Sequence, residues 1–280
     1  MDDLASVMLL IRPSHTDTVP AWLGRAAHAW FLDALRQIQP DLSAAVHDAS
    51  GSKPFTISSL LVETRGDLRQ LTPRQTYPLR LTTLHPDLTQ IVVSALIPRW
   101  LETGVQLHGQ HFRVEQVIVD PALDARTGKL NYADLVVQPP QPGRTVKMVF
   151  ASPTAFHKTG DISYPLPSPE LVFGSLQDRW MRFSSVPLPA DVKAAALARL
   201  EVDAYALRTQ RVSFERAGRG GVNGFVGQVT YRLTTGDALL KQAVTALARY
   251  ALYAGVGVRT TMGLGQARAL LPVPQHVSGD

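Results

Sequence analysis

The segment LASVMLLI, residues 4–11, is an apolar run as long as a buried strand, and it opens the series of elements that decides the fold. The next segment, up to residue 38, has apolar side chains at i, i+3, i+4 and i+7 spacing, which predicts a helix with one wide apolar face. The elements expected in the first half are a strand at 4–11, a helix at 22–38, strands at 55–62 and 77–84, a helix at 87–101 and a strand at 111–119. This order is strand–helix–strand–strand–helix–strand.

The second half of the chain repeats this order. Its expected elements are a strand at 145–151, helices at 169–183 and 192–200, a hairpin of strands at 205–216 and 222–233, a helix at 237–253 and a strand at 265–271. Each half therefore has the split βαβ order of a ferredoxin-like unit. We predict an α+β chain of two tandem ferredoxin-like (RRM-like, βαββαβ) domains, residues 1–137 and 145–280. The segment VQPPQPGR at 137–144 is the predicted linker.

Composition excludes several classes of protein. The 280 residues are 45% apolar and 18% charged, so the chain can bury a core. There is no cysteine, which excludes disulfides and thiolate metal sites. No apolar run approaches the ~18 residues of a membrane span, and the start Met-Asp-Asp has the wrong charge for a secretory signal. We therefore expect a cytoplasmic protein with no membrane association.

Positive charge is concentrated near the C-terminus. Residues 205–268 contain eight arginines and one lysine against one glutamate and one aspartate, whereas the whole chain has a net charge of +5. A basic half beside a near-neutral half favours a polyanionic partner such as a nucleic acid. A solvated arginine-rich surface is the alternative.

The most distinctive local feature is the segment GVGVRTTMGLG, with Gly255, Gly257, Gly263 and Gly265 around Arg259. It follows an expected helix and precedes an expected strand, the opposite order to the Walker and dinucleotide loops. Glycines let a backbone approach a ligand closely, and successive amides can form an anion-binding nest. A helix C-cap and a tight turn would account for one or two of the glycines.

A second candidate segment, LSAAVHDASGSKPFTIS, covers residues 42–58. His47 ends a short expected helix, and Lys53 precedes a strand. An imidazole can transfer a proton near neutral pH, and an ammonium can stabilise a developing phosphorane charge. A histidine at a helix end can also serve only the helix dipole.

Together these segments resemble the repeat-processing endoribonucleases of CRISPR systems, the sixth CRISPR-associated family of the RAMP superfamily. The family pattern "LxxxLH", a lysine and "FTxS" correspond to Leu42–His47, Lys53 and Phe55–Ser58 here, and its "GxGxxxxxGxG" corresponds to residues 255–265. The segments at 150–156 and 169–173 are similar to the family's "SPxxF" and "PxxxF" patterns. The motifs occur in the family's order.

The resemblance implies metal-independent cleavage of precursor CRISPR RNA within each repeat, without a cofactor. The ribose 2′-OH attacks the adjacent phosphate and leaves a 2′,3′-cyclic phosphate or 3′-phosphate and a 5′-OH. His47 would act as general base or acid, and Lys53 would stabilise charge.

One departure concerns the second proton carrier. Some family members carry a tyrosine on the first helix, where Leu32 stands here. His28 is the local substitute, because it shares with Arg25 and Arg36 the face opposite the apolar stripe. A solvated surface histidine is the alternative reading of His28.

Further RNA contacts are expected from basic residues outside the catalytic segment. Arg216 and Arg219 lie at the predicted hairpin tip, where the family uses a positive hairpin, and Lys158 follows the "SPxxF" segment. The other expected RNA-binding residues are Arg25, Gly255, Gly257, Arg259, Gly263, Gly265 and Arg268. His108 and His111 are three residues apart but lack further ligands, so no metal site is expected.

Two other functions remain open from the sequence. A non-catalytic RNA-binding subunit of a CRISPR effector complex would share the fold and the glycine-rich segment. A ferredoxin-like metabolic or regulatory domain would show no salt-dependent RNA binding. CRISPR repeat RNA is the expected partner, with effector subunits as further partners and a homodimer as one expected state.

Overall fold

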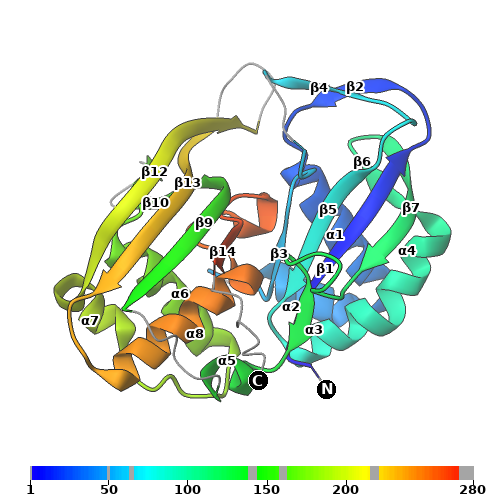
Figure 1. The fold of residues 1–280 in the computed structure, drawn as a ribbon. Helices are drawn as coiled ribbons and strands as arrows, with labels where there is room; N and C mark the ends of the chain where they lie inside the picture. Colours follow the sequence, from blue (N-terminus) through cyan, green and yellow to red (C-terminus); the bar gives the residue numbers. More distant parts are fainter. Residues whose placement is uncertain are drawn as a thin grey trace, which may run out of the picture.

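The computed structural model describes residues 2–48, 51–62, 66–137, 144–157, 163–214 and 221–270. These residues form two sheet-rich halves that lie side by side (Figure 1). None of the helices within these ranges is both long and apolar enough to cross a membrane.

The N-terminal sheet has the strand order of a ferredoxin-like domain. Its antiparallel strands follow the order β3-β5-β1-β7-β6, and β8 pairs with β1. They are β1 (Leu4–Pro13), β3 (Phe55–Ile57), β5 (Tyr77–Thr83), β6 (Val105–Leu107), β7 (Gln110–Ile118) and β8 (Gly128–Leu130). The helix α1 (Gly24–Ile38) buries the apolar stripe that the sequence predicts, including Phe31 and Leu35, in the N-terminal core.

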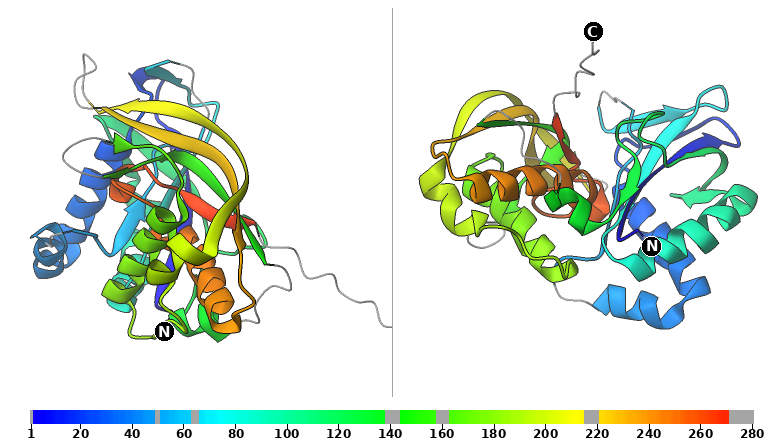
Figure 2. Two further views of the ribbon diagram at one scale, coloured as in Figure 1. Left: turned by 90° about the vertical axis from the view of Figure 1, so that its left-hand side faces the viewer. Right: turned by 60° about the horizontal axis from the view of Figure 1, so that its bottom comes forward.

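The C-terminal sheet repeats this topology as β12-β13-β9-β14. The strands are β9 (Thr145–Thr154), β12 (Leu200–Ser213), β13 (Gly221–Leu233) and β14 (Ala267–Leu270), and the helices are α6 (Pro169–Phe183), α7 (Val192–Arg199) and α8 (Ala238–Ala254). Helices α6 and α8 cover the same side of this sheet (Figure 2), and their apolar residues share one core with Met148 and Val229. The predicted pair of ferredoxin-like domains is confirmed.

Some elements differ from the sequence-based expectation. The helix expected at 87–101 is divided into α3 (Pro86–Ile91), a π-helical turn (Val92–Leu96) and α4 (Ile97–Thr103). Pro98 explains the interruption, because proline has no amide for the helical ladder. The sequence also did not predict the smaller elements β2 (Asp17–Pro20), β4 (Leu68–Leu71), α5 (Tyr132–Val137), β10 (Phe156–His157), β11 (Ser163–Tyr164) and the short helix η2 (Thr260–Met262). The short helix that it predicts before His47 is present as α2 (Pro40–Asp48).

The two halves share buried contacts at their junction. Tyr132 and Leu135 of α5 pack into the C-terminal core although α5 precedes the linker. The Tyr132 hydroxyl donates to the carbonyl oxygen of Leu84 at 3.0 Å and lies 3.2 Å from the Tyr250 hydroxyl. Residues 138–143 of the linker lie outside the described residues, and the boundaries at 137 and 145 stay predictions.

Candidate functional site

Two of the three residues that the sequence assigns to catalysis, His47 and Lys53, lie near the end of α2 (Pro40–Asp48). His47 belongs to the last turn of α2, and its side chain lies outside the described part of the structure. The ammonium of Lys53 donates a hydrogen bond of 2.6 Å to the carbonyl oxygen of Val46, the neighbour of His47. A cation at the carbonyl end stabilises a helix. Lys53 therefore holds the turn of backbone that carries His47.

His28 joins the first helix to the glycine-rich segment. Its half-buried ring stacks on Phe55 with centroids 5.6 Å apart, and its Nδ1 lies 3.0 Å from the carbonyl oxygen of Thr261. Because a carbonyl oxygen only accepts hydrogen bonds, Nδ1 carries a hydrogen. His28 thus has a structural contact between the domains, and its catalytic role stays a prediction.

The glycine-rich segment is packed between the two domains. A Cβ at Gly257 would lie 2.2 Å from the carbonyl oxygen of Ala155, and one at Gly263 would lie 2.8 Å from the amide of Ser59. All four glycines are buried and have positive φ. They are Gly255, Gly257, Gly263 and Gly265. Close backbone packing therefore accounts for every glycine of the motif, not only for one or two.

Several amides of this segment are engaged by the fold. The amide of Val258 donates to Ala155 at 2.9 Å, and that of Gly265 donates to Pro153 at 3.0 Å. Arg259 is exposed instead, in a left-handed conformation with φ of 55°, and its guanidinium lies 4.9 Å from the centre of the Phe214 ring. Direct RNA binding by the glycines and by Arg259 stays a prediction, and of these residues only Arg259 has an exposed side chain.

A large groove runs between the domains beside the glycine-rich segment. Its volume is about 1490 Å³, and Gly263, Trp22 and Phe214 contribute to its wall. Among the residues that the structure describes, five arginines line it against one carboxylate, that of Asp67. These arginines are Arg25, Arg69, Arg126, Arg208 and Arg211. Guanidinium groups beside aromatic rings are the chemistry that binds an unpaired nucleic-acid strand.

Among these arginines only Arg25 was expected to bind RNA. Arg208 and Arg211 lie in the basic C-terminal region, so its charge count was the signal that could have identified them. Arg126 lies outside this basic region, so the charge count does not identify it. Its guanidinium forms an ion pair of 2.6 Å with Asp124, which raises the pKa of Arg126 and lowers that of Asp124. Asp124 therefore fixes the side chain of Arg126 at the groove.

The other residues that the sequence predicts to bind RNA do not line the groove or are not described. Arg268 of β14 is half-buried, and because its neighbour Ala267 is in the core, the pleat directs Arg268 to the face away from the helices. Lys158, Arg216 and Arg219 lie outside the described residues. In the part of the chain that the structure describes, no three His, Asp or Glu side chains lie close enough to hold a metal ion.

Gly24 makes a close contact with the glycine-rich segment that the sequence did not predict. A Cβ at this position in α1 would lie 1.8 Å from the carbonyl oxygen of Met262, and the indole of Trp22 donates to that same oxygen at 2.9 Å. Both contacts join the first helix to the glycine-rich segment. The signal was a glycine in the first turn of a helix, where glycine is otherwise unfavourable.

We expect Gly24→Ala to lower the free energy of unfolding by about 1–3 kcal/mol, because helix and segment must move apart. Urea denaturation measures this change. Gly174→Ala in α6 is the matched control, since its Cβ would meet only Lys193 at 3.5 Å, and a helix gains about 0.5–1 kcal/mol from alanine. Equal effects of the two substitutions would contradict the close contact.

Two family models match the chain. Residues 5–108 match the CRISPR Cas6 N-terminal domain, and residues 148–267 match the CRISPR-associated endoribonuclease Cas6. No curated protein sequence matches the chain.

Solved structures of two Cas6 proteins are similar over nearly their whole length. The product complex of Thermus thermophilus Cas6 (TTHB231) has a TM-score of 0.81 at 28% identity, over 96% of this chain and 100% of that chain. The product complex of Cas6 (TTHA0078) has a TM-score of 0.74 at 30% identity, over 95% and 98%. A substrate mimic complex of TTHA0078 has a TM-score of 0.72 at 27% identity, over 96% and 100%.

Proposed function

This chain belongs to the Cas6 family of CRISPR-associated endoribonucleases, and we propose that it cleaves precursor CRISPR RNA within each repeat by metal-independent attack of a ribose 2′-OH. The products would be a 2′,3′-cyclic phosphate or 3′-phosphate end and a 5′-OH end. Related Cas6 structures hold a product or a substrate mimic, which supports an RNA substrate for this chain.

The observation that carries the proposal is the meeting of three segments around the end of α2. Lys53 holds the last turn of α2, in which His47 lies. His28 contacts Thr261 in the glycine-rich segment. Arg179 of α6 donates to Ser52 at 3.4 Å and to the carbonyl oxygen of Gly255 at 2.8 Å, which ties the segment before Lys53 to the same glycines.

The proposed roles follow from these positions. His47 transfers a proton to or from the reacting oxygens. Lys53 adds positive charge near the phosphate while it holds the helix end. His28 is the second candidate proton carrier.

The groove supplies the proposed path of the RNA strand. Gly263 lines the groove. Gly255 accepts a hydrogen bond from Arg179, which also contacts Ser52, just before Lys53. A strand held by the groove arginines would therefore cross the glycine-rich segment before it reaches the end of α2. Arg25 and Arg259 are the contacts that we assign along this path, with Arg268, Lys158, Arg216 and Arg219 as further proposed contacts.

Cleavage of labelled repeat RNA in excess EDTA tests the proposal. We expect the same rate with and without the chelator, because the proposed proton transfers and charge stabilisation use side chains alone. Treating the products with a phosphatase and a kinase identifies their ends, and a 5′-OH is expected. Loss of cleavage in EDTA, or a 5′-phosphate, would indicate a metal-dependent nuclease instead.

A wild-type protein that binds repeat RNA without cleaving it would support the alternative of a non-catalytic subunit. Association with CRISPR effector subunits, a homodimer and a cytoplasmic location stay predictions.

A further inference from the structure

The glycine-rich segment follows the C-terminus of α8, and the C-terminus of a helix repels anions. The carbonyl oxygens at the C-terminus of a helix carry partial negative charge, so phosphate groups normally bind at helix N-termini. Here α8 ends at Ala254, and the segment proposed to approach RNA begins at Gly255. A phosphate near this segment would meet the unfavourable pole of the helix.

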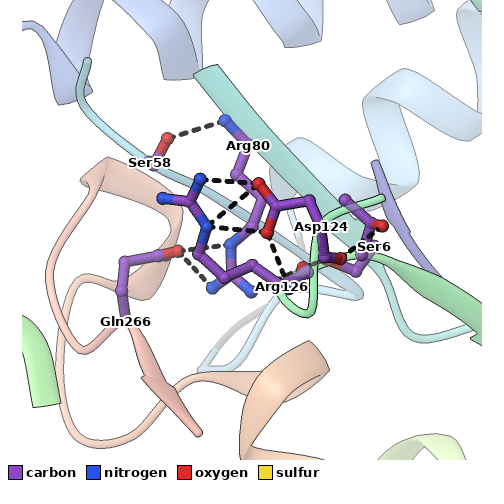
Figure 3. Close-up of polar contacts among 7 residues, drawn as sticks. Ser6, Ser58, Arg80, Asp124, Arg126 and Gln266 are labelled. Atoms are coloured by element: carbon purple, nitrogen blue, oxygen red, sulfur yellow. Dashed lines mark hydrogen bonds and ion pairs between the residues drawn. The ribbon is translucent and has the colours of Figure 1, made fainter. Parts of the chain in front are cut away.

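Two buried arginines, one from each domain, donate to the carbonyl groups at this pole. Arg179 donates to Ala254 at 2.9 Å and to Gly255 at 2.8 Å. Arg80 of β5 reaches across from the N-terminal sheet and donates to Leu252 at 3.1 Å. It also donates through Nε to the side-chain oxygen of Gln266 at 3.0 Å, and Arg126 and Asp124 lie beside it (Figure 3).

Neither arginine has a carboxylate of its own among the described residues. Asp124, the carboxylate beside Arg80, is bound to Arg126, and Asp178, beside Arg179, is bound to Lys193. Both guanidinium groups are buried, with 4% and 7% of their residue surface exposed. Burial lowers the pKa of each arginine to about 10, so both remain cationic at neutral pH. Buried arginines are ordinarily paired with a carboxylate, so two buried cations that are held at one helix end by carbonyl and amide oxygens instead are a costly arrangement.

We propose that Arg80 and Arg179 are positioning residues for the RNA, which reverse the negative potential at the C-terminus of α8 so that the glycine-rich segment accepts a backbone phosphate. The inference rests on the proposed function, since it assumes that this segment meets RNA. The two cations are fixed by the fold and need no rearrangement when the phosphate arrives.

Gln266→Glu tests the electrostatic part of this proposal without removing a hydrogen bond. The Nε2 atom of Gln266 is buried and has no hydrogen-bond partner among the described residues, and Oε1 accepts from Arg80. The glutamate keeps the acceptor and adds a negative charge beside Arg80. We expect an unchanged or higher melting temperature but at least about fivefold weaker binding of repeat RNA at low salt. Gln90→Glu, exposed on α3, controls for the change in net charge.

Arg179→Lys and Arg179→Met give an independent test. Lysine retains the charge and methionine only the bulk, so we expect lysine to preserve RNA affinity better than methionine. The salt dependence of binding should keep its slope in both, because Arg179 touches no phosphate, whereas Arg25→Ala should reduce the slope by about 0.7.

The binding assays use repeat RNA with a 2′-deoxyribose at the cleavage site, so the outcome does not depend on cleavage. Wild-type binding without cleavage of unmodified RNA would contradict the proposed function and leave this test intact. If Gln266→Glu binds as tightly as Gln90→Glu, or if the lysine and methionine variants bind alike, the two arginines serve only the fold. A reduced salt slope for Arg179→Met would indicate a direct phosphate contact and would also overturn the proposal.

Discussion

His47→Ala lowers the single-turnover rate of repeat cleavage by about 10²–10⁴-fold, the contribution expected of a positioned acid or base. The affinity for uncleavable repeat RNA changes by less than about threefold, because the groove arginines that bind the strand are unchanged. Quenched-flow cleavage with enzyme in excess measures the rate, and filter binding measures the affinity.

His15→Ala is the matched control for this prediction. His15 is an exposed histidine in the connection between β1 and β2, and it does not line the groove. The His15→Ala variant should therefore cleave RNA at the wild-type rate. If His47→Ala cleaves RNA as fast as the control, His47 does not transfer a proton in the reaction. His28 would then be the leading candidate for that role.

Elements with strong periodicity could be predicted from the sequence. The helix expected at 169–183 has those bounds in the structure, and both strand orders follow from the ferredoxin-like series. The prediction of one helix at 87–101 was only partly right, because apolar spacing alone does not reveal the π-helical turn that precedes Pro98. Local patterns therefore predict elements well where packing and propensity agree.

The site could be predicted only where its residues are close in the chain. The pair His47 and Lys53 and the four glycines stand out as motifs. Arg80 does not, because the polar side chain of an alternating strand looks exposed until the second domain covers it. Its partners Gln266 and Leu252 are more than 170 positions away in the chain.

The interpretation of the glycines changes for the same reason. Their spacing indicates close backbone approach, but the sequence does not say what approaches. The structure identifies the neighbours as Ala155, Ser59 and other backbone from both domains. The motif therefore joins the domains, whatever it contributes to RNA binding.

The proposed reaction predicts that one missing oxygen in the RNA stops cleavage. A repeat RNA with 2′-deoxyribose on the 5′ side of the scissile phosphate lacks the nucleophile, so cleavage there should fall by more than about 10³-fold, at least as much as loss of a proton-transfer group. The same RNA should still bind, because the phosphates that the groove arginines contact are intact. Moving the deoxyribose one nucleotide along is the matched control and should restore the rate. Continued cleavage at the deoxy position would require water as the nucleophile, and His47 and Lys53 would then have to activate that water rather than a sugar hydroxyl.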